Sequence, residues 1–92
     1  MTTFFLFGKY SQEAIKKISG QRSKEAVALI EGAGGKILSG YAVMGEYDLV
    51  LLVQFSSNSQ AFKTSVGLAK LLGISFTTAP AVSIEEFDQL VG

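Results

Sequence analysis

Hydrophobic residues recur along the chain with two different periods, and these periods predict strands and helices in turn. Residues 3–8 and Leu49–Phe55 are apolar on both faces of an extended chain, as in strands that are covered on both sides. Lys36–Met44 alternates less regularly, which is typical of an edge strand. Ile74–Pro80 also alternates, and Pro80 places this fourth strand at a sheet edge because proline cannot donate to a strand ladder.

Two helical segments are expected between the first and second strands. Ser11 is a good N-cap for a short helix that Ser19 and Gly20 interrupt. A longer helical stretch runs from about Arg22 to Ala33 and ends at Gly34, because glycine readily adopts the left-handed conformation that closes a helix. We expect the two segments to form one bent connection.

Two further helices are expected in the second half of the chain. Ser57 with Gln60 forms a capping box for the third helix, and Gly73 ends it. Ser83 with Glu86 forms a second capping box, which opens a short final helix. The residues expected to anchor the third helix to the core are Phe62, Val66 and Ala69.

A hairpin is expected between the second and third strands. Gly45 and Glu46 separate the two strands by a hairpin-length connection, and Gly45 supplies the positive φ of a tight turn. The order of elements is then β-α-β-β-α-β with a terminal helix, an α+β arrangement that is the ferredoxin-like sandwich. In this topology the first and third strands are central, and they are also the two most apolar strands. The sequence predicts one such domain over residues 1–92.

The third strand also predicts self-association. Its alternating residues place one apolar row on each side of the sheet, whereas both main helices cover the same side. We therefore expect a symmetric dimer with the sheets packed face to face. The alternative is that the terminal helix folds back over the open face of its own sheet. The two rows are Tyr47, Leu49, Leu51, Val53 and Phe55 on one side and Val50 and Leu52 on the other.

Charge and composition exclude several function classes. Eight basic residues balance eight acidic residues, which disfavours nucleic-acid and membrane partners. The chain has no Cys and no His, so a metal site or a haem cofactor is not expected, and no other cofactor is indicated. The first residues lack the features of a signal peptide, and Leu49–Val53 is too short to cross a bilayer, so a cytoplasmic location is expected.

The run Gly45-Glu46-Tyr47-Asp48, followed by an apolar strand, resembles the GYD domain family. Gly34-Gly35-Lys36, Tyr41 and Ser83–Phe87 extend the resemblance over almost the whole chain. It implies a fold of the dimeric α/β barrel type, in a family whose function is largely unknown. The wider superfamily contains cofactor-independent oxygenases, haem-degrading enzymes, lactone isomerases and ligand-sensing domains of transcription regulators.

Five residues are candidates for a ligand site, and each has a structural alternative. Asp48 can act as a general base, or it can fix the turn by accepting backbone hydrogen bonds. Tyr41 and Tyr47 can present hydroxyl groups or serve in packing. Arg22 can clamp a carboxylate or phosphate, or pair with an acidic side chain. Lys9 can meet an anionic ligand or remain solvated.

No catalytic signature is recognisable, so the leading hypothesis is a non-enzymatic module. It would be a small-ligand-binding or regulatory homo-oligomer that holds an apolar or aromatic molecule. The second hypothesis is a cofactor-independent oxygenase or isomerase for an aromatic, quinol or lactone substrate, with Asp48 as the base. The third is a structural assembly subunit.

Overall fold

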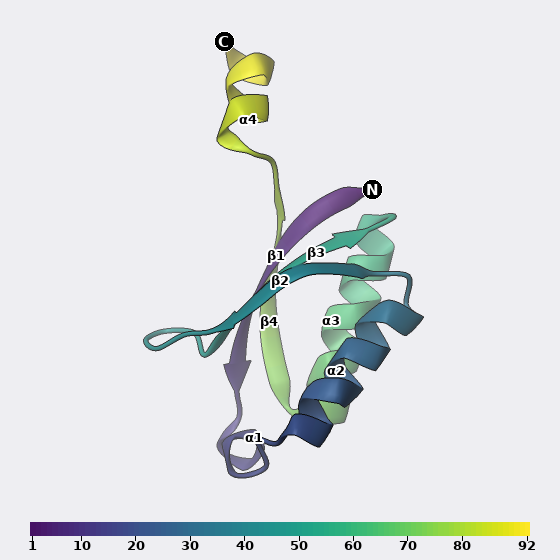
Figure 1. Ribbon diagram of the computed structural model, residues 1–92, viewed down its shortest axis with the longest axis vertical. Helices are drawn as coiled ribbons and strands as arrows, with labels where there is room; N and C mark the ends of the chain where they lie inside the picture. The colour runs from purple at the N-terminus through teal and green to yellow at the C-terminus, as the bar shows by residue number, and fades with distance from the viewer.

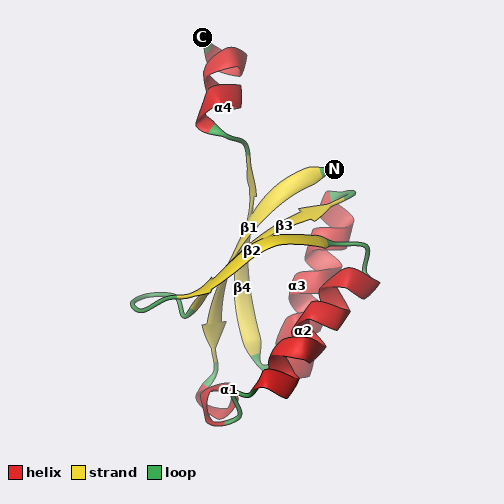
Figure 2. Cartoon of the chain, viewed as in Figure 1, coloured by secondary structure: helices red, strands yellow, loops and turns green.

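The computed structural model describes residues 1–92 as a four-stranded antiparallel sheet with two helices packed on one face (Figures 1 and 2). The strand order β2-β3-β1-β4 puts the first and third strands in the centre. The predicted ferredoxin-like α+β topology is therefore confirmed, including the edge position of the strand that contains Pro80. The elements are β1 (Thr2–Tyr10), α1 (Gln12–Lys16), α2 (Gly20–Gly32), β2 (Lys36–Ala42), β3 (Leu49–Phe55), α3 (Asn58–Leu72), β4 (Ile74–Ala81) and α4 (Ile84–Val91).

The core lies between the sheet and the pair α2 and α3. Phe4 is paired with Val53 across β1 and β3, and the Phe4 ring meets the Phe55 ring edge to face at 5.8 Å. Each fully buried side chain of this size contributes about 1.5–3 kcal/mol of transfer free energy. The buried cluster is Phe4, Leu6, Ile30, Val53, Phe55, Ala61, Leu68, Leu72 and Ile74.

Helix α3 buries a different face from the predicted one. Phe62 and Val66 are 72% and 51% exposed, so the prediction that they anchor the helix is wrong. The helix begins and ends as expected, because Ser57 Oγ accepts from the Gln60 N–H group and Gly73 has φ +70°. The docked face is a different row of residues on the helix. It consists of Ala61, Thr64, Leu68 and Leu72.

The connection between β2 and β3 is longer than the expected hairpin. The strands end at Ala42 and resume at Leu49, and the Val43 N–H group donates to the Asp48 carbonyl at 2.9 Å. Gly45 has the positive φ that was predicted, +127°. The N–H group of Asp48 donates to the Gly8 carbonyl of β1. This hydrogen bond holds the end of the loop against β1 before β3 begins.

The connection from β1 to β2 consists of two helices, α1 and α2, which are interrupted before Gly20 as expected. Ser11 Oγ accepts from the Ala14 N–H group at 3.0 Å, and Ser19 Oγ accepts from the Arg22 N–H group at 3.2 Å. Each helix therefore has its own serine N-cap, and α2 begins at Gly20, earlier than predicted.

Helix α4 stands away from the body of the molecule, beyond the end of β4 (Figure 1). None of its residues is buried, so the expected alternative in which it covers the open sheet face of its own chain is wrong. That face carries Phe5 and Phe7, which stack at 5.8 Å, together with their β3 partners Leu52 and Val50.

Candidate functional site

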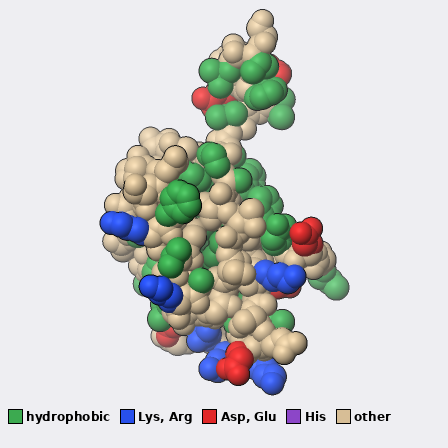
Figure 3. All heavy atoms as spheres, turned by 180° about the vertical axis from the view of Figure 1, so that it is seen from behind, with side chains coloured by type: hydrophobic (Ala, Val, Ile, Leu, Met, Phe, Trp, Pro, Cys, Tyr) green, Lys and Arg blue, Asp and Glu red, His purple; other side chains and the backbone are tan.

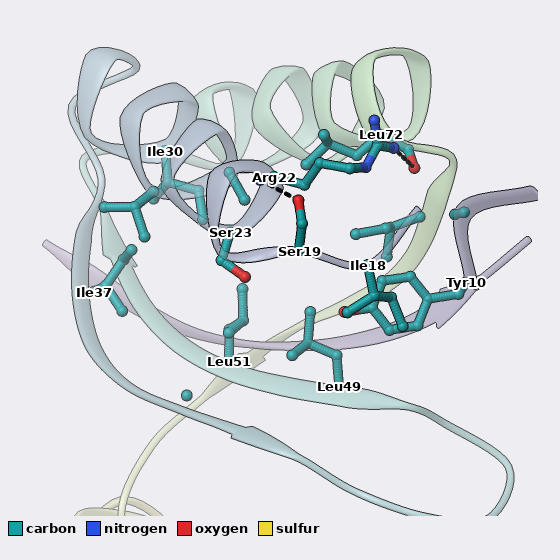
Figure 4. Close-up of a pocket in the computed structure, with 15 residues that line it drawn as sticks. Tyr10, Ile18, Ser19, Arg22, Ser23, Ile30, Ile37, Leu49, Leu51 and Leu72 are labelled. Carbon is teal, nitrogen blue, oxygen red and sulfur yellow. Dashed lines mark hydrogen bonds between the residues drawn. The ribbon is translucent and has the colours of Figure 1, made fainter. Parts of the chain in front are cut away.

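A cavity of about 220 Å³ lies between α2 and the sheet, and α1 closes one of its ends (Figure 4). Eleven of the fifteen residues that line it are hydrophobic. A cavity of this composition suits the apolar part of a small molecule. The lining residues are Tyr10, Ala14, Ile18, Ser19, Arg22, Ser23, Ala26, Val27, Ile30, Ile37, Gly40, Leu49, Leu51, Leu72 and Ile74.

The floor of the cavity follows from the alternation of side chains along the strands. Leu49 and Leu51 lie on the face of β3 that carries the core residue Val53, and in Figure 4 they lie below Ser19 and Ser23. The helices bury Val53 completely, whereas they leave the cavity open above Leu49 and Leu51 at the start of β3.

Arg22 is the one charged residue of the cavity lining, and no acidic residue joins it there. Its Nη2 donates to the Leu72 carbonyl at 2.7 Å, at the last turn of α3 (Figure 4). A cation at this point satisfies a carbonyl that has no partner within the helix and complements the helix dipole. The guanidinium is thereby held at the cavity with further N–H donors unused.

Asp48 does not line the cavity, but it forms a hydrogen bond with Tyr10, which does. Its Oδ2 accepts from the Tyr10 N–H group at 3.0 Å, beyond the point where the β1–β3 ladder ends at Gly8 and Leu49. The carboxylate thus takes the place of a strand partner for Tyr10, whose side chain lines the cavity.

The remaining three candidates lie on the opposite side of the sheet. The Tyr47 ring packs on Phe7 at 5.3 Å, and its hydroxyl lies 3.4 Å from Thr77 Oγ1. Tyr41 pairs with Val50 and is 65% exposed, and Lys9 pairs with Ser75. The expectation that Tyr47 shares a face with Leu49 is wrong, because Tyr47 belongs to the loop that precedes β3.

The sheet therefore separates Arg22 from the two tyrosines and Lys9. Sequence reasoning missed most of the cavity lining, including Tyr10, Ser19 and Ser23. A signal was present in the spacing of Ser19, Arg22 and Ser23, since residues three and four apart share one helix face.

Other kinds of site have little support in the structure. No group of three Asp and Glu side chains gathers closely enough to hold a metal ion. The helices are also too short or too polar for any of them to traverse a bilayer.

Comparison with solved structures identifies the same fold in proteins of low sequence identity. FFRP-DM1 superposes with a TM-score of 0.62 at 20% identity, covering 89% of this chain and 100% of that one. Hypothetical protein PHS023 from Pyrococcus horikoshii gives a TM-score of 0.57 at 20% identity, covering 90% and 92% of the two chains. The Mycobacterium tuberculosis leucine response regulatory protein LrpA gives 0.59 at 16% identity.

The chain covers 51% of the LrpA chain and is itself covered over 89% of its length, so it corresponds to about half of that regulator. No curated protein matches the sequence. The family model described as GYD domain matches residues 4–91, nearly the whole chain. The chain therefore belongs to the GYD domain family.

Proposed function

We propose that this chain is a small-ligand-binding or regulatory module that acts as a homo-oligomer in the cytoplasm. Its ligand is a small molecule with an apolar or aromatic body and one carboxylate group. The observation that carries the proposal is the cavity beneath α2, which is mainly apolar and contains a single charged group, the Arg22 guanidinium, with no acidic neighbour in the lining.

The ligand's charge follows from Arg22. Arg22 is partly buried, and a guanidinium prefers a planar anion that it can bind through two N–H groups. The Leu72 carbonyl occupies one N–H donor of the guanidinium, and no acidic side chain of the lining engages the others. The hydroxyl groups of Ser19 and Ser23 on the same helix face supply additional donors for a bound carboxylate.

The size and polarity of the cavity limit the rest of the ligand. Its floor and walls come from Leu49, Leu51, Ile37 and Ile30, which offer no hydrogen-bonding side chain. A volume of about 220 Å³ accommodates a short aliphatic or single-ring body. In support, one structure with this fold is a feast or famine regulatory protein from M. tuberculosis complexed with L-methionine, at a TM-score of 0.59 and 17% identity.

The oligomer forms, in this proposal, through the open face of the sheet. Phe5 and Phe7 stack there, and Tyr47 extends the aromatic surface. Apolar surface of this kind on a central strand pair is characteristic of an interface. A two-fold axis through this face lets the same residues cover one another in both subunits.

The remaining candidates have supporting roles in the proposal. Asp48 positions Tyr10 at the cavity, and Tyr41, Tyr47 and Lys9 belong to the face that meets the second subunit. None of the four needs to touch the ligand.

Native mass spectrometry of the purified full chain tests both parts of the proposal. We expect the mass of a dimer or a higher even assembly, and an added mass per subunit when hexanoate or phenylacetate is present. The neutral amides of the same acids serve as the control and are expected to leave the mass unchanged. A monomer that takes up the acids and the amides equally would contradict the proposal.

A further inference from the structure

Helix α4 has an apolar side that meets nothing in its own chain. Ile84 is 76% exposed and Phe87 49%, and no residue of the helix is buried. An isolated helix of eight residues is unstable in water, since helix nucleation costs more than a few hydrogen bonds return. A further surface must therefore cover α4 for the helix to persist.

The remaining side of α4 is acidic. Successive residues turn by about 100° along a helix, so Ile84, Phe87 and Leu90 fall on one arc. Glu86 falls beside one border of that arc and Asp88 beside the other, and the helix contains no basic residue. The surface that covers α4 is expected to be apolar with basic borders.

Helix α3 presents such a surface on its outer side. Phe62 and Val66 are exposed there, and the row continues at Ala69. Shallow grooves run beside this row, between α3 and the edge strand β4, and they are lined in part by Pro80 and Phe76. Figure 3 shows exposed hydrophobic side chains on the body of the molecule, with Lys or Arg side chains beside them. Helix α4, above the body in this view, carries hydrophobic and acidic side chains.

The charges and lengths of the two surfaces match. Lys63 and Lys70 lie on one border of the α3 row, and α3 has no acidic residue. The helix α4 is about 12 Å long and the row from Phe62 to Ala69 about 10 Å, at 1.5 Å per residue. One acidic border of the α4 arc, at Glu86 or at Asp88, can therefore face the lysine border of α3 while the apolar arc covers the row.

We propose that α4 of one chain docks on the α3 row of a second copy of the same chain. Only Val82 and Ser83 connect β4 to α4, and they carry the helix past the end of the sheet, away from its own α3 (Figure 1). If each chain docks its α4 on the α3 row of the other, both α4 helices are covered in one closed dimer. This contact is separate from the open sheet face and does not depend on a ligand.

The absence of cysteine from the chain allows a direct test. Val66→Cys and Phe87→Cys are made in separate full-length chains, one of which carries a mass tag, and the two are mixed and oxidised mildly. A disulfide between the differently sized chains can form only between copies, and we expect it to be the main mixed product. Ile15→Cys is the matched control for Val66→Cys, because both native residues are 51% exposed.

Charge reversal supplies the second measurement. Lys63→Glu with Lys70→Glu is expected to lower the yield of the mixed disulfide about fivefold, because like charges then face the acidic border of α4. Adding Glu86→Lys and Asp88→Lys to the Phe87→Cys chain is expected to restore it. A mixed yield no higher than that of the Ile15→Cys control would overturn the proposal. So would an intrachain disulfide in a chain that carries both cysteines, because α4 would then reach its own α3.

Discussion

Asp48 completes a strand ladder that the backbone leaves unfinished, since its Oδ2 accepts from the Tyr10 N–H group at 3.0 Å. The two residues are far apart in the sequence, since Tyr10 ends β1 and Asp48 lies in the loop before β3. The fold brings them together because β1 and β3 are neighbouring strands. The contact fixes the residue whose side chain forms one end of the cavity. This relationship explains the Asp of the GYD motif without assigning it any chemistry.

The first prediction concerns this hydrogen bond. Asp48→Ala leaves the partly buried Tyr10 N–H group without an acceptor and is expected to lower the free energy of unfolding by about 1–3 kcal/mol. Asp48→Asn retains an acceptor oxygen and is expected to cost less than about 1 kcal/mol. Urea denaturation measures both. Equal losses in the two variants would show that the charge, and not the acceptor, is what matters at this position.

The second prediction compares two neighbouring hydroxyl groups on α3. Thr64 Oγ1 is buried without a hydrogen-bond partner, whereas Ser65 Oγ lies 2.8 Å from the Ala61 carbonyl and 2.7 Å from Thr78 Oγ1. Thr64→Val removes an unpaired polar atom at almost constant volume and is expected to stabilise the fold by about 1 kcal/mol.

Ser65→Ala serves as the opposite case, because it deprives Thr78 of its side-chain partner. We expect it to destabilise the fold by about 1 kcal/mol in the same thermal or urea titration. A loss of stability in Thr64→Val would indicate that its hydroxyl has a partner after all.

The third prediction concerns the end of α3. Gly73 has φ +70°, and a Cβ there would lie 2.9 Å from Ser11 Oγ, the cap of α1. Gly73→Ala is therefore expected to cost about 1–2 kcal/mol, since both the backbone conformation and the contact are unfavourable. Gly32→Ala is the control: nothing lies within 4 Å of its Cβ position, and helix propensity favours alanine. A similar shift of the melting temperature in both variants would contradict this prediction.

The fourth prediction tests the open sheet face. Leu52 pairs with Phe5 in the centre of that face, so Leu52→Lys would place an ammonium group in the proposed interface. We expect sedimentation velocity at micromolar concentration to show a folded monomer or a strongly weakened dimer. Ile15→Lys changes an exposed apolar residue on α1 and is expected to leave the oligomer intact. An unchanged oligomer in Leu52→Lys would place the interface elsewhere.

The sequence pattern was sufficient for the topology, because strands with two apolar faces can only be central. It was not sufficient for α3, where two apolar rows compete on one helix: the row with Phe62 and Val66 is exposed, and the row with Leu68 and Leu72 is buried. The two rows are similar in side-chain size, so size alone does not predict which row docks.

The cavity was even less accessible to prediction. Arg22 was recognised by its chemistry, but its neighbours in the lining come from seven elements that only the folded chain brings together. The Tyr47 side chain lies on the other side of the sheet because a six-residue loop, and not a tight turn, precedes β3. No local pattern in the sequence reports a loop length of this kind.

The fifth prediction concerns the guanidinium of Arg22. Arg22→Gln removes the charge from the cavity, whereas Lys24→Gln removes a charge from an exposed position of the same helix that does not line the cavity. Charge-assisted hydrogen bonds to a carboxylate contribute about 1.5–3 kcal/mol, so the dissociation constant of a bound acid is expected to rise at least about tenfold in Arg22→Gln.

Isothermal titration of hexanoate or phenylacetate into wild type, Arg22→Gln and Lys24→Gln is the most direct test of the ligand site. The account predicts saturable binding in the wild type and in Lys24→Gln, and binding that is lost or at least about tenfold weaker in Arg22→Gln. Equal affinity in all three proteins, or no binding of either acid to the wild type, would contradict it.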